Sequence, residues 1–249
     1  MRTLARTHRQ GAFREALTRT HTPPSVRMRP GARRRTPRDV QGSSVPSIYQ
    51  LKPAFQGVLR PLVGALARAG VTANQVTVLA VLLCVAVGVA IGTVDDPRIL
   101  LLLPLALFLR MALNAVDGML AREHAQQSKL GAILNELGDV VGDAAMYLPL
   151  ALRPGFPVAA IVVFVLLGVI VEMTGVVGVQ IGASRRYDGF GKSDRAFVVG
   201  AAGLALGLGW MSVEWFGWLL WIGVTLGGAA IVTRARRALA EIRTKEGVA

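Results

Sequence analysis

Long apolar stretches follow one another through most of this sequence, and they constrain its fold more than any other feature. A helix needs roughly 20 mostly apolar residues to cross a bilayer. Stretches close to that length occupy residues 73–94, 98–121, 129–152, 156–182, 195–212 and 214–233. Hydrophobic residues make up 53% of the chain, whereas an average soluble domain has roughly 45–50%. The sequence therefore predicts an all-α, polytopic membrane protein with six transmembrane helices.

The chain divides by composition into four segments. Residues 1–45 contain eleven arginines, two acidic residues and few large apolar ones, which predicts a disordered, Arg-rich cytoplasmic arm. A transit peptide, or a chain that starts at Met28, would also fit this composition. Residues 46–70 are expected to form a separate helix, residues 71–233 the six-helix transmembrane domain, and residues 234–249 a basic cytoplasmic tail.

The segment before the first apolar stretch has the pattern of an amphipathic helix. Its large apolar residues recur at three- and four-residue steps, at Leu51, Phe55, Leu59, Leu62 and Leu66. Such a helix lies along the membrane surface with its apolar side toward the lipid. Gly70 is expected to end it, and Thr72 or Asn74 to cap the helix that follows.

The formal net charge of +13 raises the question of nucleic acid, but the basic residues lie in the N-terminal segment, the loops and the tail. Among the expected loops, one side of the membrane would hold most of them, namely Arg122, Lys129, Arg185, Arg186, Lys192 and Arg195. The other side would hold only Arg98 and Arg153. By the positive-inside rule both termini are cytoplasmic and the protein is a multi-pass protein of the plasma (inner) membrane. We therefore expect contact with anionic lipid and no nucleic-acid partner.

Polar side chains recur at helical spacing between residues 114 and 143, although apolar runs lie on both sides. Asn135, Asp139 and Asp143 are four residues apart and share one helix face, and Asn114 and Asp117 share another. Ionisable groups within membrane spans are costly and indicate function. Oxygen ligands from two helices could bind a hard cation such as Mg²⁺ or Mn²⁺. Cys84 is the only cysteine, which excludes an intramolecular disulfide and a Cys-based metal cluster.

One gapped motif in this stretch resembles the signature of a known family. The run D-G-x2-A-R-x8-G, followed eight residues later by Asp139, is formed by Asp117, Gly118, Ala121, Arg122 and Gly131. It resembles the pattern D-x2-D-G-x2-A-R-x8-G-x3-D-x3-D of the CDP-alcohol phosphotransferase (CDP-alcohol phosphatidyltransferase) family. Asn114 replaces the first aspartate of that pattern and Asn135 the third. The residues Gly70–Thr77 also resemble the family's usual entry into its first span.

The resemblance implies an enzyme of phospholipid biosynthesis that needs one or two Mg²⁺ or Mn²⁺ ions. It would transfer a phosphatidyl group from a CDP-linked lipid, most simply CDP-diacylglycerol, to an alcohol acceptor and release CMP. The acceptor stays open: glycerol phosphate, an inositol phosphate, serine or another alcohol would fit. The family also implies a homodimer.

The resemblance assigns roles to individual residues. Asp139 would be the general base and also a ligand of the metal ions, and Asp117 a further metal ligand. The face that binds the CDP moiety would comprise Asp117, Gly118, Ala121, Arg122 and Gly131. Gly191 and Lys192 match the family's Gly-Lys loop, so Arg185, Lys192 and Arg195 are expected to contact phosphate.

The two asparagines leave a question about charge. An amide oxygen can ligate Mg²⁺ but brings no negative charge, so Asn114 and Asn135 remain candidate ligands. Asp143, one turn beyond Asp139, is expected to restore the missing charge, and Glu136 is a less well placed candidate. The competing readings are a non-catalytic relative that acts as a membrane scaffold and an ion-coupled transporter. Glu172, in the middle of an apolar stretch, is expected to form a buried pair or to serve as a polar group at an interface. Arg110, one turn before Asn114, is expected to pair with an aspartate.

Overall fold

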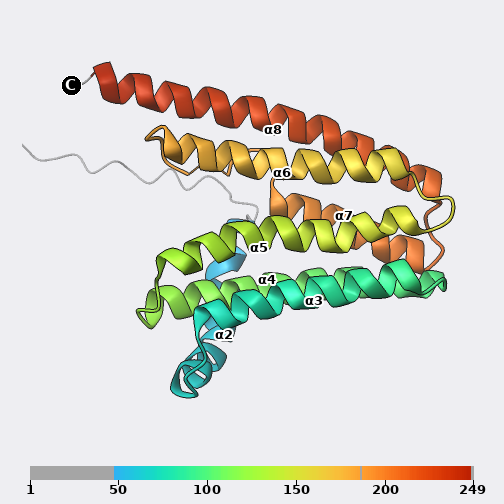
Figure 1. Cartoon of the computed structure of the whole chain (residues 1–249), viewed down its shortest axis with the longest axis horizontal. Helices are drawn as coiled ribbons and strands as arrows, with labels where there is room; N and C mark the ends of the chain where they lie inside the picture. Colours follow the sequence, from blue (N-terminus) through green and yellow to red (C-terminus); the bar gives the residue numbers. More distant parts are fainter. Residues whose placement is uncertain (1–47, 186, 248–249) are drawn as a thin grey trace, which may run out of the picture. The chain divides into compact units, whose positions relative to one another are not determined.

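The computed structural model describes residues 48–185 and 187–247, and within them the only regular secondary structure is helical (Figure 1). The chain divides into two units, residues 1–45 and 46–249, and all of the described residues belong to the second. The arm predicted for residues 1–45 lies outside the described residues. The prediction of an all-α, polytopic membrane protein is confirmed.

Each expected apolar stretch corresponds to one helix or to a pair of consecutive helices. The elements are α2 (Ile48–Arg68), α3 (Ala73–Thr93), the 3₁₀-helix η1 (Pro97–Leu101), α4 (Leu102–Glu123), α5 (Lys129–Tyr147), the 3₁₀-helix η2 (Leu148–Leu152), α6 (Val158–Gln180), α7 (Lys192–Gly207) and α8 (Val213–Gly247). The helix expected at residues 214–233 continues without a break to Gly247. It therefore includes most of the residues assigned to the basic tail.

Four of these helical segments are long and apolar enough to cross a membrane. They are Ala73–Thr93, Pro97–Glu123, Val158–Gln180 and Val213–Gly247. The stretch expected at 129–152 corresponds to α5 with η2, and the stretch expected at 195–212 corresponds to α7. Neither is both long and apolar enough to count among these spans. α5 carries several charged side chains, and α7 has only 16 residues. A count of six membrane-spanning helices therefore stays a prediction.

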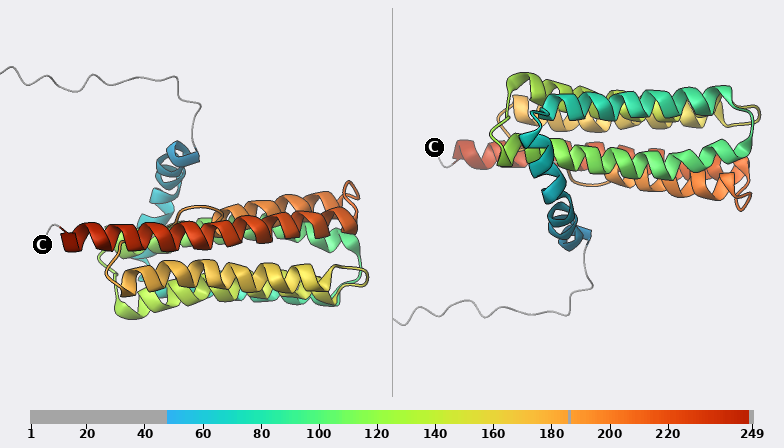
Figure 2. Two further views of the ribbon diagram at one scale, coloured as in Figure 1. Left: turned by 90° about the horizontal axis from the view of Figure 1, so that it is seen from above. Right: turned by 90° about the horizontal axis from the view of Figure 1, so that it is seen from below.

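The long helices run side by side in an up-and-down arrangement (Figure 1). α3 packs against both α4 and α5, α6 packs against α8, and α7 packs against α4. The loops after α4 and α6 lie at one end of this bundle, together with the C-terminal end of α8, and the loops after α3, η2 and α7 lie at the other. α2 crosses the direction of these helices steeply (Figure 2), as a helix along a membrane surface would.

Local sequence signals explain where several helices begin. Thr72 caps α3 and forms a capping box with Gln75, as one of the two expected alternatives predicted. The expected stop at Gly70 is also present, because this residue has the left-handed φ of 77° that glycine adopts without strain. Ser128 caps α5 by accepting a hydrogen bond from the Gly131 N–H.

The core consists of two apolar clusters. The larger cluster contains residues from every element between α3 and α8. Among them are Cys84, Ile91, Leu103, Phe164 and Phe216, whose side chains are almost fully buried. A smaller cluster joins α2, α3 and α4 beside Asp117. Large apolar side chains also remain exposed on the outer faces, for example Leu79, Leu82 and Val89 of α3, which suits a protein surrounded by lipid.

Candidate active site

Asp117 is a buried carboxylate on α4 that lies among apolar neighbours. Its side chain is only 3% exposed. The Thr77 hydroxyl, from α3, lies 2.7 Å from Asp117 Oδ2 and 3.1 Å from the Ala73 carbonyl oxygen, so the shorter contact is to the carboxylate. Asp117 Oδ1 is buried without a hydrogen-bond partner among the described residues. A buried anionic oxygen needs a compensating partner, and a bound cation would supply one.

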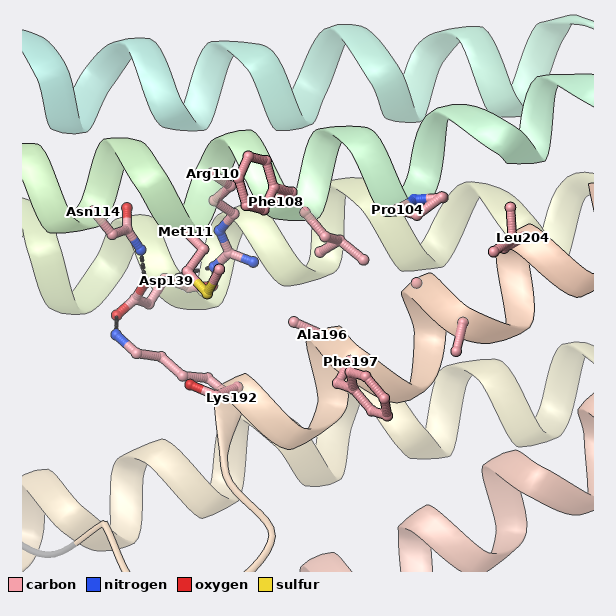
Figure 3. Close-up of a pocket in the computed structure, with 14 residues that line it drawn as sticks. Pro104, Phe108, Arg110, Met111, Asn114, Asp139, Lys192, Ala196, Phe197 and Leu204 are labelled. Atoms are coloured by element: carbon pink, nitrogen blue, oxygen red, sulfur yellow. Dashed lines mark hydrogen bonds and ion pairs between the residues drawn. The ribbon is translucent and has the colours of Figure 1, made fainter. Parts of the chain in front are cut away.

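Asp139 lies on α5 and connects three helices (Figure 3). The Asn114 amide on α4 donates to Asp139 Oδ1 at 3.0 Å, and the Lys192 ammonium at the start of α7 contacts Asp139 Oδ2. Arg110, one turn before Asn114, donates to the backbone carbonyl of Asp139 at 2.6 Å. In the sequence, Asn114 is 25 residues and Lys192 is 53 residues from Asp139, and the structure brings the three side chains together.

The residues expected to bind the CDP moiety lie where α4 ends and α5 begins. Arg122 is exposed, and its guanidinium nitrogens would be only 3.1 Å from a Cβ placed on Gly118. Gly131 is approached closely by the Asn74 side chain, whose Oδ1 would be 2.8 Å from a Cβ there. Small residues at these two positions therefore allow neighbouring side chains to lie against the helix backbone. Ala121 is partly buried on the same turn as Arg122.

The predicted metal ligands do not all have the same surroundings. Asn135 is partly exposed and makes no hydrogen bond among the described residues. Asp143 is buried, and its two oxygens accept from Arg110 and, at 3.0 Å, from Arg195. Glu136 is paired with Arg185 at 2.7 Å. Asp143 and Glu136 are therefore each neutralised by arginine, and a metal-ligand role for Asp143 stays a prediction.

Glu172 of α6 is the centre of a buried ionic network. Its carboxylate lies 3.4 Å from Arg185, 3.6 Å from Arg195 and 3.8 Å from Arg234. This agrees with the buried pairing expected of Glu172. Two of the three residues expected to contact phosphate, Arg185 and Arg195, therefore each face two carboxylates, and only Lys192 lines the adjacent cavity.

Two members of the site were not identified from the sequence. Thr77 follows Asn74 by three residues on the same helix face, and this spacing could have indicated it. Arg234 was assigned to the basic tail, yet it is 1% exposed and donates to the backbone carbonyls of Val171 and Asp188. Its only sequence signal is its position directly after an apolar stretch.

A cavity of about 460 Å³ lies between α4 and α7 and ends at the polar cluster. In Figure 3, Phe108 and Met111 on α4 face Ala196 and Phe197 on α7 across this space, and Asn114, Asp139 and Lys192 close one end. The walls are mostly apolar. This shape could hold an apolar chain along the helices, with a polar group at the end where Asp139 lies.

Comparisons with known proteins agree with this arrangement. A family model of CDP-alcohol phosphatidyltransferases matches residues 70–229. Inner membrane protein YnbA of Escherichia coli (strain K12) is 44% identical over 178 residues, which cover 70% of this chain and 87% of YnbA.

Solved structures share the fold. Mycobacterium tuberculosis phosphatidylinositol phosphate synthase (PgsA1) with CDP-DAG bound superposes with a TM-score of 0.61 at 20% identity, over 72% of this chain and 92% of that chain. The same enzyme in complex with manganese and citrate also has a TM-score of 0.61 at 20% identity, over 72% of this chain and 88% of that chain.

Proposed function

This chain belongs to the CDP-alcohol phosphatidyltransferase family, and we propose that it transfers a phosphatidyl group from CDP-diacylglycerol to an alcohol and releases CMP. The observation that carries the proposal is the apolar cavity that ends at Asn114, Asp139 and Lys192. It offers a place for a lipid chain next to a polar site with a buried carboxylate. The CDP-DAG bound to PgsA1 supports the choice of donor.

The residues have distinct parts in the proposed reaction. The acceptor hydroxyl attacks the lipid-side phosphorus while Asp139 takes its proton, and the bond between that phosphorus and the CMP oxygen breaks. Asp139 is the candidate base because its carboxylate lies at the polar end of the cavity, where donors on α4 and α7 hold it in place. Arg122 and Lys192 would balance the negative charge of the diphosphate.

A divalent cation fits the site through Asp117, whose buried Oδ1 has no other partner among the described residues. Bound there, Mg²⁺ or Mn²⁺ would neutralise the diphosphate and stabilise the departing CMP. Asn114 and Asn135 can supply neutral oxygen ligands. Asp117, Gly118, Ala121, Arg122 and Gly131 would hold the CDP moiety.

The acceptor is best matched by an alcohol without a phosphate group. Arg185 and Arg195 are already paired with carboxylates of Glu136, Glu172 and Asp143, so an anionic acceptor would compete with these ion pairs. An acceptor phosphate would have to displace a buried carboxylate, which is costly.

We propose that the protein is a multi-pass inner membrane protein with both termini cytoplasmic and that it forms a homodimer. The name of the relative YnbA supports the location. The basic residues Arg122 and Lys129 flank the loop after α4, and Asp117 lies six residues before the end of α4. This arrangement favours a site that opens toward the cytoplasm.

The proposed reaction is tested by CMP release from labelled CDP-diacylglycerol by the purified protein with Mn²⁺. The acceptor panel pairs glycerol with glycerol 3-phosphate and inositol with inositol phosphate, and also includes serine. We expect release with at least one acceptor, and faster release with the phosphate-free member of a pair. Asp139→Ala should abolish it. Asp95→Asn, an exposed carboxylate at the opposite end of the bundle, is the matched control and should keep full activity.

Other outcomes would support a different class of protein. No CMP release with any acceptor, from a protein that retains its fold, would favour a scaffold. Ion flux in liposomes without CMP release would favour a transporter. Release that survives Asp139→Ala would remove the assignment of the base but not the transfer reaction.

A further inference from the structure

We propose that this chain binds a single divalent cation, and that the Lys192 ammonium and the Asn114 amide take the place of a second cation at Asp139. The inference rests on the proposed function and concerns how the site balances charge. It follows from which carboxylates are free to hold metal and which are already occupied.

Among the described residues of the site, Asp117 and Glu172 each have a buried carboxylate oxygen without a hydrogen-bond partner, but Glu172 Oε1 lies 3.6 Å from Arg195. Asp117 Oδ1 therefore has the surroundings of a cation ligand. Asp117 Oδ1 is buried and has no partner among the described residues, while Thr77 holds the other oxygen. The described residues contain no group of three or more Asp, Glu, His or Cys side chains that could hold a metal ion. A site with one free carboxylate oxygen and neutral amide oxygens suits one divalent ion, because each further ion needs further anionic ligands.

Asp139 is already held by two donors from other helices. Asn114 donates an N–H to Oδ1 at 3.0 Å, and Lys192 places its ammonium against Oδ2. An aspartate at position 114 could not donate this hydrogen bond and would repel Asp139. The asparagine therefore does more than weaken a metal site, because it gives Asp139 a partner that a carboxylate could not provide.

The neighbouring carboxylates do not supply the missing negative charge. Asp143 accepts from Arg110 and Arg195, and Glu136 pairs with Arg185. Taking either one to ligate a metal would remove one of the carboxylates that these buried or partly buried arginines face. The compensation expected of Asp143 and Glu136 would therefore require these ion pairs to break.

The charges balance with one ion. The cluster is neutral before any ion binds, because five carboxylates stand against five cations: Asp117, Asp139, Asp143, Glu136 and Glu172 against Arg110, Arg185, Arg195, Arg234 and Lys192. One divalent cation then matches the two negative charges of a diphosphate. A second divalent ion would leave two positive charges without a partner in a site bordered by lipid, where such an excess is costly.

The number of bound ions is measured directly, without substrate. Purified full-length protein in detergent is titrated with Mn²⁺, and free Mn²⁺ is followed by electron paramagnetic resonance. We expect one Mn²⁺ per chain for the wild type and for the control Asp95→Asn, and none for Asp117→Asn. The double variant Asn114→Asp/Asn135→Asp should bind two, because it restores two carboxylates.

The wild-type result alone decides the main point, so a double variant that fails to fold does not prevent the test. Two ions per wild-type chain, or none, would overturn the inference. A folded double variant that still binds one ion would overturn the role given to the two asparagines. CMP release is scored separately, so an active enzyme with two ions would contradict this inference while leaving the proposed function in place.

Discussion

Asp117 and Asp139 are both buried carboxylates of the proposed site, and their hydrogen-bond partners differ. Both oxygens of Asp139 accept from donors on α4 and α7, and these contacts fix the position of its carboxylate beside the cavity. Asp117 receives one hydrogen bond and keeps one oxygen free of partners among the described residues, which suits a ligand. The hydroxyl of Thr77 decides which Asp117 oxygen stays free, so Thr77 acts as a positioning residue.

Thr77→Val removes this hydroxyl with little change in volume. Because groups that orient metal ligands typically contribute about 10–100-fold to affinity or activity, we expect Mn²⁺ binding and CMP release each to fall by roughly tenfold or more. Thr77→Ser keeps the hydroxyl and should restore both. Measuring the Mn²⁺ affinity separates this effect from general destabilisation, which the melting temperature of the same samples reports.

An unchanged Mn²⁺ affinity in Thr77→Val would show that the contact with Asp117 does not orient a metal ligand. Equal losses in Thr77→Ser and Thr77→Val would show that packing at this position matters, and not the hydrogen bond.

For single residues, the sequence identifies site members that lie close together along the chain. It misses contacts between residues that are far apart in the sequence. Asp117 and Asp139 follow from a gapped motif within one short stretch of chain. The contact of Lys192 with Asp139 and the burial of Arg234 depend on how α5, α7 and α8 pack. No spacing rule in a single sequence reports that packing, so the ionic partners of Arg185 and Arg195 could not be derived.

Among the elements, α3 fixes the separation of the two helices that carry the site. It packs against both α4, with Asp117, and α5, with Asp139. Its close approach to α5 is possible because Gly88 has no side chain: a Cβ there would overlap the backbone carbonyl oxygen of Ala145. Small residues at helix contacts in membranes allow backbones to approach in this way.

Gly88→Ala should therefore destabilise the protein and disturb the site. A forced fit into a packed interface costs typically about 1–3 kcal/mol, and the overlap here involves backbone, which cannot rotate away. We expect a lower melting temperature in detergent and reduced CMP release. Gly228→Ala on α8 is the matched control, because nothing lies within 4 Å of its Cβ position.

A Gly88→Ala protein with the same melting temperature as the control would contradict the close packing of α3 on α5.

The positions of the helices were largely predictable from the sequence, because an apolar stretch of about 20 residues indicates one helix in a membrane. The ends of α7 and α8 were less so. α8 extends to Gly247 through residues that favour helix but lack apolar character, and composition alone does not distinguish a continued helix from a tail.

For the whole molecule, the distribution of charge predicts how the bundle is oriented. The end with the polar site also holds the loops after α4 and α6, and the opposite end holds the loop after α3 (Figure 1). In the proposed reaction, a CDP-linked donor and a water-soluble acceptor could meet at this site only if that end faces the compartment where both occur. The proposed function therefore requires one orientation in the membrane. This orientation can be measured by labelling introduced cysteines, because the chain has a single natural cysteine, Cys84.

Single cysteines at the two ends should react with opposite membrane faces. Cys84 is 0% exposed, so the wild type should not be labelled by a membrane-impermeant maleimide. Asp95 and Gln127 are exposed at opposite ends, and neither side chain makes a hydrogen bond among the described residues. In intact cells we expect Asp95→Cys to be labelled and Gln127→Cys to be labelled only after permeabilisation. The reverse pattern would place the site on the outer face, where the basic loops would violate the positive-inside rule and a cytoplasmic nucleotide-linked lipid could not reach Asp139.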